Sequence, residues 1–348
     1  MHKTRSALFV LRRRDPSQHW CQRPYSHFSS GLFNSARFVQ EMLRDSGVRA
    51  GLVEVTDGND VDREVTKFDP QYVILEAIWC PPYKLKELVG LHRHRHRGWI
   101  VRNHSEMPFL AMEGISLGWL LEYAATPHTT IGLNSPVACE DLNGLLEARG
   151  LGPTLLLPNF YPLPAKAPEK REGPPGAPLD VACFGAIRPL KNHVEQALAA
   201  VLLGRRLDRG IRFHINATRI EGNADPILKT LRSIFTGTPG CQLVEHNWMD
   251  HSDFIRLCSR MELGMQVSFS ETFNIVSADL VAHGVPVVGS SEIPWLPESY
   301  QADPHDSVEI AHVARKALRS GLREEFRHLR IYCQTSKETW LETLFPEP

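Results

Sequence analysis

A proline-rich segment divides this sequence into two parts. Residues 158–178 read PNFYPLPAKAPEKREGPPGAP and hold seven prolines in 21 positions. Proline fixes φ and lacks a backbone N–H, so this density fits neither the interior of a helix nor a central strand. We therefore predict a linker here, at residues 161–178. The chain of 348 residues is long enough for one domain on each side of it.

Both sides of the linker alternate short apolar runs with stretches of helical periodicity. Before the linker, the runs predicted as strands are Ser6–Leu11, Ala50–Val55, Tyr72–Trp79, Trp99–His104, Thr129–Asn134 and Thr154–Pro158. After it, they are Leu179–Gly185, Arg212–Ala217, Cys241–His246, Leu263–Phe269 and Val285–Ser290. Strand and helix in series predict parallel sheets covered on both faces. We therefore expect an α/β chain of two Rossmann-like, doubly wound domains that face a central cleft.

The end of the chain is predicted to be helical. Residues 307–345 are polar, with Trp340, Leu341 and Phe345 as apolar anchors, so this part can pack back across the linker. The predicted organisation is a Rossmann-like domain at 1–160, the linker at 161–178, a second Rossmann-like domain at 179–325, and a C-terminal helix at 326–348 that returns to the first domain.

Charge and cysteine content narrow the function classes. The 39 Lys+Arg and 40 Asp+Glu give a formal charge of −1, which argues against a domain that holds nucleic acid mainly through phosphates. The seven cysteines are odd in number and lack a CxxC pair, which argues against a zinc module or a disulfide scaffold. No apolar run suits a signal peptide or a membrane span. We expect a cytoplasmic chain without a transmembrane segment.

The segment SETFNIVSAD carries two acids eight residues apart, Glu271 and Asp279. It follows a predicted strand and begins a predicted helix, on which eight residues span about 12 Å. Paired carboxylates that act on one glycosidic bond stand about 5–9.5 Å apart, so these two suit the ends of one extended ligand. The plainer alternative is that Glu271 caps the helix and Asp279 is a surface acid.

The start of this helix suits a phosphate group, because free backbone N–H groups and the helix dipole both point there. The residues concerned are Thr272, Phe273, Asn274 and Ile275. Sugar, diphosphate and ribose diol follow one another along a nucleotide sugar, which fits two acids with a helix N-terminus between them.

With its continuation LVAHGVPVVGSS, this segment resembles the donor-binding signature of the retaining family-four glycosyltransferases of GT-B fold. The resemblance implies that Glu271 lies near the donor sugar and that Asp279, shorter than the family's glutamate, binds the ribose hydroxyls. CFGAIRPLKNH at 183–193 resembles the family's diphosphate-binding segment. Gly185 and Lys191 match it, whereas Ala186 stands at the arginine position, so Arg188 is the proposed substitute.

The first half resembles the same family more loosely. HFSSGLFNSARF at 27–38 takes the place of a glycine-rich loop of which Gly31 remains. WIVRNHSEMPF at 99–109 resembles the segment that carries a histidine near the reacting sugar, which makes His104 the candidate; a satisfied structural histidine is the alternative. LLLPNFYP at 155–162 resembles the family's PNG segment at the domain boundary.

The resemblance implies a hexosyl- or pentosyltransferase that moves a sugar from a UDP- or GDP-sugar to an acceptor hydroxyl with retained configuration. No tightly bound cofactor, no metal and no stable protein partner are implied. Positive groups lower the barrier to diphosphate departure. The resemblance thus implies His104, Glu271, Arg188 and Lys191 as the catalytic residues.

The acceptor stays open. The first half also resembles glycosyltransferases of bacterial viruses, so a hydroxymethylated DNA base stands beside a surface glycan or a lipid-linked sugar. The alternative functions are a nucleotide-sugar epimerase or isomerase of the same fold, and a catalytically silent nucleic-acid-binding protein. A metal at HRHRHR (92–97) is disfavoured, because no acidic or cysteine partner with ligand spacing follows and the interleaved arginines repel a cation. A metal at the DVD triplet (60–62) is disfavoured, because this stretch reads more simply as a turn whose acidic residues start a helix.

Overall fold

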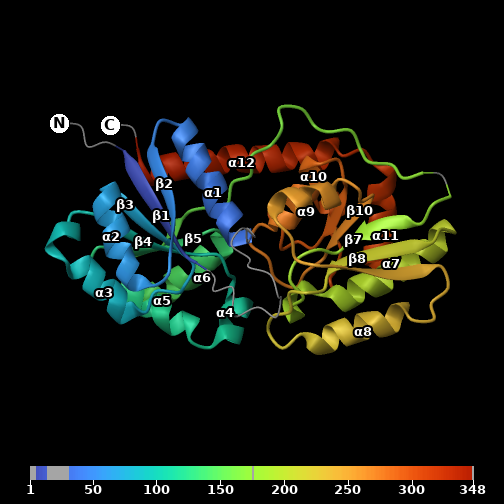
Figure 1. The fold of residues 1–348 in the computed structure, drawn as a ribbon, viewed down its shortest axis with the longest axis horizontal. Helices are drawn as coiled ribbons and strands as arrows, with labels where there is room; N and C mark the ends of the chain where they lie inside the picture. The colour runs from blue at the N-terminus through green and yellow to red at the C-terminus, as the bar shows by residue number, and fades with distance from the viewer. Residues whose placement is uncertain (1–4, 14–30, 175, 347–348) are drawn as a thin grey trace. The chain divides into compact units, whose positions relative to one another are not determined.

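The computed structural model describes residues 5–13, 31–174 and 176–346 (Figure 1). The chain forms two compact units. Unit 1 comprises Met1–Pro162 and Cys333–Pro348, and unit 2 comprises Leu163–Tyr332. Within the described part of the chain, no helix combines the length and the apolar character that a membrane crossing requires.

Unit 1 is built on a parallel six-stranded sheet with the order β2-β1-β3-β4-β5-β6. The strands are β1 (Ser6–Arg12), β2 (Arg49–Val55), β3 (Tyr72–Glu76), β4 (Gly98–Asn103), β5 (Thr129–Leu133) and β6 (Leu155–Leu156). The helices are α1 (Gly31–Asp45), α2 (Gly58–Phe68), α3 (Pro82–Gly90), α4 (Met107–Glu113), α5 (Ser116–Ala124) and α6 (Pro136–Glu147), with a 3₁₀ turn at His92–His94.

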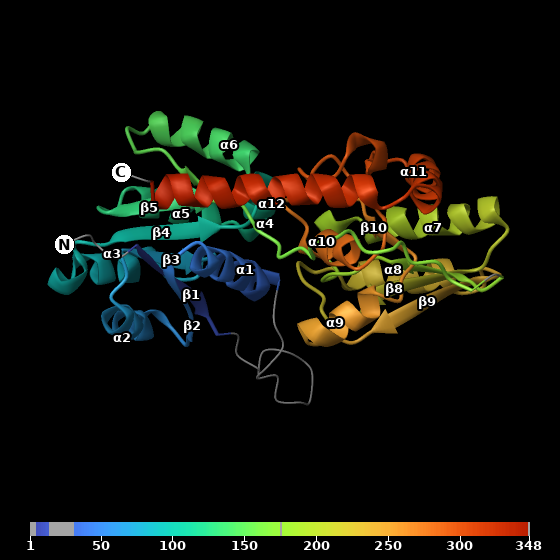
Figure 2. The same ribbon diagram turned by 90° about the horizontal axis from the view of Figure 1, so that it is seen from above.

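Both faces of this sheet are buried, because successive side chains of a strand point to opposite faces. Along β1, Leu8 and Val10 join an apolar cluster with side chains of α2, α3, α5 and α6. Phe9 joins a second cluster with side chains of α1 and with Trp340 of α12 (Arg323–Leu344). Helices cover both sides of the sheet (Figure 2). This explains why the strand sequences are continuously apolar and do not alternate apolar with polar residues.

Unit 2 is built on a parallel five-stranded sheet with the order β11-β10-β7-β8-β9. The strands are β7 (Leu179–Ala182), β8 (Ile211–Asn216), β9 (Cys241–His246), β10 (Leu263–Gln266) and β11 (Val287–Gly289). The helices are α7 (His193–Leu207), α8 (Asp225–Phe235), α9 (His251–Cys258), α10 (Ile275–Ala282), α11 (Ser307–Arg319) and the first part of α12. In Figure 1, α9 and α10 lie on one side of these strands and α7 and α8 on the other.

The predicted α/β class with two Rossmann-like units is confirmed. Every run predicted as a strand overlaps an observed one. The proline-rich segment, predicted as a linker, is attached to unit 2 from residue 163 onward. Arg171 donates its backbone N–H to the Gly284 carbonyl at 2.8 Å, and the Gly173 N–H binds Glu262 at 2.9 Å.

Gly284 is the residue on which this attachment packs most closely. Its φ is +89°, and a Cβ placed there would lie 2.3 Å from the backbone oxygen of Glu169. We expect Gly284→Ala to lower the free energy of unfolding by about 1–3 kcal/mol, because both the left-handed backbone and the clash oppose a side chain. Gly321→Ala is the matched control, since nothing lies within 4 Å of its added Cβ. Equal denaturation midpoints for the two variants would contradict this packing.

A buried acid joins α12 to the sheet of unit 2. The Glu325 side chain is fully buried and accepts the Val287 backbone N–H of β11 at 2.7 Å. Burial raises the pKa of Glu325 to about 8 from an ordinary value of 4.5. Between pH 4.5 and about 8, the folded chain therefore keeps a proton on Glu325 that the unfolded chain has released.

The stability that this proton provides is complete below pH 4.5 and is lost as the pH rises through about 8. Glu325→Gln cannot titrate and keeps an acceptor for Val287. We expect it to be more stable than the wild type at pH 9, with a smaller difference at pH 5, in denaturant titrations. Glu298→Gln, at an exposed acid of the same unit, is the control and should leave the wild-type pH dependence unchanged. Parallel pH profiles for Glu325→Gln and wild type would refute the assignment.

Candidate functional site

The strand order of unit 2 reverses between β7 and β10. From β7 the chain proceeds outward through β8 to β9, and then crosses to β10 and β11 on the other side. In open α/β sheets of this kind, ligands bind outside the carboxyl ends of the strands at such a reversal. The two segments that leave the sheet there are 183–192 after β7 and 267–274 after β10. Both were singled out in the sequence.

An ion pair joins these two segments. The Lys191 ammonium contacts the Glu271 carboxylate at its Oε1 atom, and the two side chains are 20% and 9% exposed. Ser268 donates its hydroxyl to the same oxygen at 2.9 Å, and the Asn274 amide donates to it at 3.0 Å. Among the described residues, Oε2 of Glu271 receives no hydrogen bond. One carboxylate oxygen is thus fixed by three donors while the other can accept from a ligand.

Asn274 shapes the start of α10. It adopts the left-handed conformation (φ 57°) as the N-cap of α10, and its side chain accepts the Ser277 N–H at 2.9 Å. The same side chain donates to Gln266 and Glu271, so it joins strand, acid and helix. Phe273 is buried, and its carbonyl accepts from the Trp295 indole at 2.8 Å. The helix begins at Ile275, the last of the four residues predicted to form its phosphate-binding start.

The segment after β7 brings Gly185 and Arg188 to the same region. Gly185 has φ 114°, its N–H binds Asn216 at 2.9 Å, and no atom lies within 4 Å of an added Cβ, so its backbone is open to close approach. Arg188 pairs with Glu221 at 2.5 Å. Arg219 binds the same carboxylate at 2.5 Å. Ala186, at the family's arginine position, is buried.

Asp279 lies on α10 and is almost fully buried. Its Oδ1 atom is 3.0 Å from Nε2 of His251, the first residue of α9. The sequence does not predict this partner, because 28 residues separate the two. The proposed contact of Asp279 with a ribose stays a prediction.

In unit 1, His104 directly follows β4 and lies beside the end of β3. Its Nε2 atom is 2.5 Å from Oε2 of Glu76, the last residue of β3. The Arg102 guanidinium lies 3.2 and 3.3 Å from the two Glu76 oxygens. Glu76 and Arg102 are both fully buried. This pair was not predicted from the sequence, although a charged residue inside an otherwise apolar strand is a signal for it.

Burial and mutual pairing set the pKa values of this group. Burial alone raises the pKa of Glu76, but Arg102 and His104 outweigh it and leave the pKa below its ordinary value. Burial and then Arg102 lower the pKa of His104, against the opposing effect of Glu76. At neutral pH the group therefore consists of a carboxylate, a guanidinium and a neutral imidazole.

Gly31 is the first residue of α1. The rest of the predicted glycine-rich loop before it, His27 to Ser30, lies outside the described residues. The two segments weighed as metal sites contact each other. Asp62 of the DVD triplet pairs with Arg93 and, at 2.8 Å, with the buried His94 of HRHRHR.

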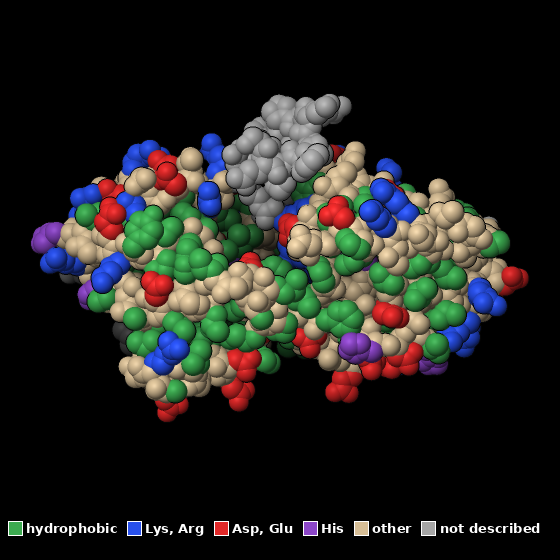
Figure 3. Space-filling view, turned by 90° about the horizontal axis from the view of Figure 1, so that it is seen from below, with side chains coloured by type: hydrophobic (Ala, Val, Ile, Leu, Met, Phe, Trp, Pro, Cys, Tyr) green, Lys and Arg blue, Asp and Glu red, His purple; other side chains and the backbone are tan. Residues whose placement is uncertain are grey.

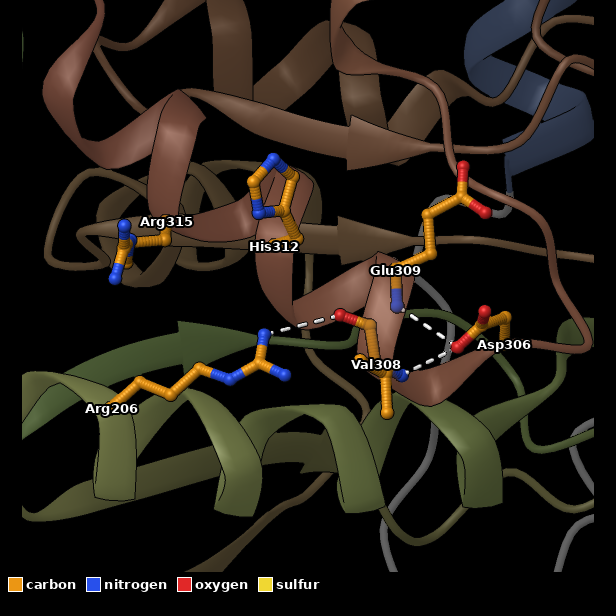
Figure 4. Close-up of a pocket in the computed structure, with 6 residues that line it drawn as sticks. All are labelled: Arg206, Asp306, Val308, Glu309, His312 and Arg315. Atoms are coloured by element: carbon orange, nitrogen blue, oxygen red, sulfur yellow. Dashed lines mark hydrogen bonds between the residues drawn. The ribbon is translucent and has the colours of Figure 1, made fainter.

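A surface pocket of about 440 Å³ lies elsewhere in unit 2 (Figure 4). It is lined by Arg206, Asp306, Val308, Glu309, His312 and Arg315. Arg206 lies near the C-terminal end of α7, whereas Lys191 precedes the start of that helix. Two polar side chains of the pocket are held by the start of α11: Arg206 donates to the Val308 carbonyl, and Asp306 accepts the backbone N–H groups of Val308 and Glu309.

Comparison with known proteins identifies the fold. The sequence matches no protein-family model and no curated protein sequence. A UDP-forming trehalose-phosphate synthase of Burkholderia xenovorans matches in structure with TM-score 0.65 and 14% identity over 98% of this chain and 99% of the other. Anabaena HepE, solved with UDP and glucose, matches with TM-score 0.61 and 12% identity over 97% of this chain and 99% of the other.

A third structure shares the arrangement over a smaller part. A mutant of Staphylococcus aureus TarM, solved with fondaparinux, α-GlcNAc-glycerol and UDP, matches with TM-score 0.55 and 13% identity over 82% of this chain and 55% of the other. At these identities the likeness shows the fold alone. The two Rossmann-like units are those of the predicted GT-B fold.

Proposed function

We propose that this protein is a glycosyltransferase that uses a nucleotide sugar, bound by unit 2. The observation that carries the proposal is the contact between Lys191 and Glu271 at the strand reversal, with the start of α10 beside it. In a nucleotide-sugar complex, Lys191 would bind the diphosphate and Glu271 the sugar. The start of α10 would add backbone N–H groups for a phosphate. Structural neighbours solved with UDP support the same ligand class.

Each predicted cation already has an acidic partner. Lys191 contacts Glu271, and Arg188 contacts Glu221. A diphosphate that binds here exchanges one anionic partner for another, so the cations need not be desolvated anew. As charge develops on the leaving diphosphate, Lys191 and Arg188 stabilise it, while Oε2 of Glu271 accepts from a sugar hydroxyl. We assign transfer with retained configuration, as in the family-four enzymes that the sequence resembles.

For the acceptor we favour a glycan or another sugar hydroxyl. Figure 3 shows acidic and basic side chains interspersed on the face that it presents, without an extended field of one sign. The near-zero formal charge agrees with this. A hydroxymethylated DNA base remains the second candidate, because Arg93 and Arg95 are exposed and can contact phosphates; strongly salt-dependent binding is its signature.

Lys191→Ala should lower the affinity for UDP or GDP by roughly 10- to 100-fold in calorimetry, since a charge-assisted contact contributes about 1.5–3 kcal/mol. Lys229→Ala is the matched control: it removes an exposed lysine of α8 in the same unit. Equal affinities for the two variants would rule out Lys191 as a diphosphate contact.

The reaction class is tested with a panel of UDP- and GDP-sugars, incubated with oligosaccharides, with hydroxymethylated DNA or without acceptor, and followed by mass spectrometry. Acceptor-dependent release of nucleoside diphosphate is the expected result, and Glu271→Ala should abolish it. Conversion of the sugar nucleotide alone would indicate an epimerase or isomerase instead. DNA retention without turnover would indicate a binding protein.

A further inference from the structure

The group around His104 contains more interactions than burial of a salt bridge requires. Arg102 is neutralised by Glu76 and also donates to the carbonyls of Leu157 and Pro158, at 3.0 and 3.2 Å, and to the Asn159 side chain at 2.7 Å. His104 therefore is not needed to satisfy the buried charges. It nevertheless makes the shortest contact of the group, 2.5 Å to Glu76.

The distances decide which ring nitrogen of His104 carries the proton. Nε2 faces two charged neighbours among the described residues, the Glu76 carboxylate at 2.5 Å and Nη1 of Arg102 at 3.5 Å. A carboxylate only accepts and a guanidinium only donates, so they favour opposite tautomers. The nearer carboxylate prevails, and a neutral His104 then bears its proton on Nε2 and a lone pair on Nδ1.

The backbone beside this contact is strained. Ala77, which follows Glu76, has φ 69°, and its N–H donates to the Arg102 carbonyl at 2.8 Å. A non-glycine residue in this region costs about 1–3 kcal/mol and occurs preferentially at functional sites. In unit 1 the strand order reverses between β1 and β3, so the end of β3 also lies where a ligand is expected.

We propose that Glu76 is a positioning residue that fixes His104 as the Nε2–H tautomer, so that its Nδ1 accepts a hydrogen bond from a substrate hydroxyl. The inference rests on the proposed glycosyltransferase function for the identity of that hydroxyl. The tautomer itself is independent of it. The lowered pKa of His104 agrees with a neutral ring at physiological pH.

The first test needs no substitution at Glu76. Long-range ¹H–¹⁵N spectra of the wild-type protein labelled at histidine should include the signal of a neutral Nε2–H tautomer at pH 7 that belongs to His104. Loss of this signal in His104→Gln assigns it among the 16 histidines. A neutral Nδ1–H tautomer, or an imidazolium at pH 7, overturns the proposal.

The second test uses Glu76→Asp, because Glu76→Gln would leave the buried Arg102 unpaired and endanger folding. The shorter acid keeps the charge but withdraws from His104. The ring should then show mixed tautomers, and kcat should fall by roughly 100-fold, as expected for a displaced substrate contact. Adding His104→Gln should cause little further loss, because the two residues act as a unit.

Asp62→Glu is the matched control. It changes the length of the acid in a second carboxylate–histidine pair of unit 1, that of Asp62 and His94, which lies outside the proposed machinery. It should alter the His94 signal and leave kcat unchanged. Wild-type kcat in Glu76→Asp, with the tautomer altered, would reduce Glu76 to a structural role and overturn the proposal.

The kinetic readout also identifies the hydroxyl. If Glu76→Asp raises only the KM for the nucleotide sugar, the hydroxyl belongs to the donor. If it raises only the KM for the acceptor, the hydroxyl belongs to the acceptor. If wild-type protein turns over no nucleotide sugar, the proposed function fails, whereas the spectra still decide the tautomer.

Discussion

The buried charge of Arg102 constrains the structure of unit 1 at the carboxyl ends of β3 and β4. A guanidinium removed from water costs several kcal/mol unless its donors and its charge are satisfied. Here Glu76 supplies the charge, and the chain from Leu157 to Asn159 supplies the oxygens. The guanidinium carbon of Arg102 lies 5.1 Å from the ring centroid of Trp340 of α12, which donates its indole N–H to the Pro158 carbonyl. One buried charge thus fixes β3, β4, the chain after β6 and the C-terminal helix.

At the strand reversal of unit 2, the charges are arranged differently: the cations are only partly buried. A site for a diphosphate needs cations that are held in place yet available. Lys191 and Arg188 are each partly exposed and each contact an acid, so neither stands as an isolated buried charge. Glu271 is in turn held by Ser268 and Asn274. The acid that orients Lys191 is therefore anchored from the sheet and from the helix cap, which preorganises the site.

The sequence predicted the sheets well, because their strands are buried on both faces and read as uninterrupted apolar runs. It also marked Lys191 and Glu271, which are 80 residues apart, because the segments that carry them resemble the diphosphate-binding segment and the donor-binding signature of the family-four glycosyltransferases. It could not predict which charges pair. The contact of Arg188 with Glu221 and that of Asp279 with His251 depend on side-chain geometry between segments that are far apart in the sequence. Glu76 and Arg102 were hidden inside runs recognised for their apolar character.

Two histidine–carboxylate pairs of unit 1 show why spacing alone cannot assign a role. The ring of His94 is fully buried, but its acid, Asp62, is 30% exposed and is shared with the exposed Arg93. That pair lies at a surface turn, where the carboxylate is open to solvent. Glu76 has no access to solvent, and His104 is 16% exposed, so the ring lies between a buried charge and the surface. A buried carboxylate that orients a partly exposed imidazole suits ligand contact, because the fixed tautomer needs no reorganisation when a hydroxyl arrives.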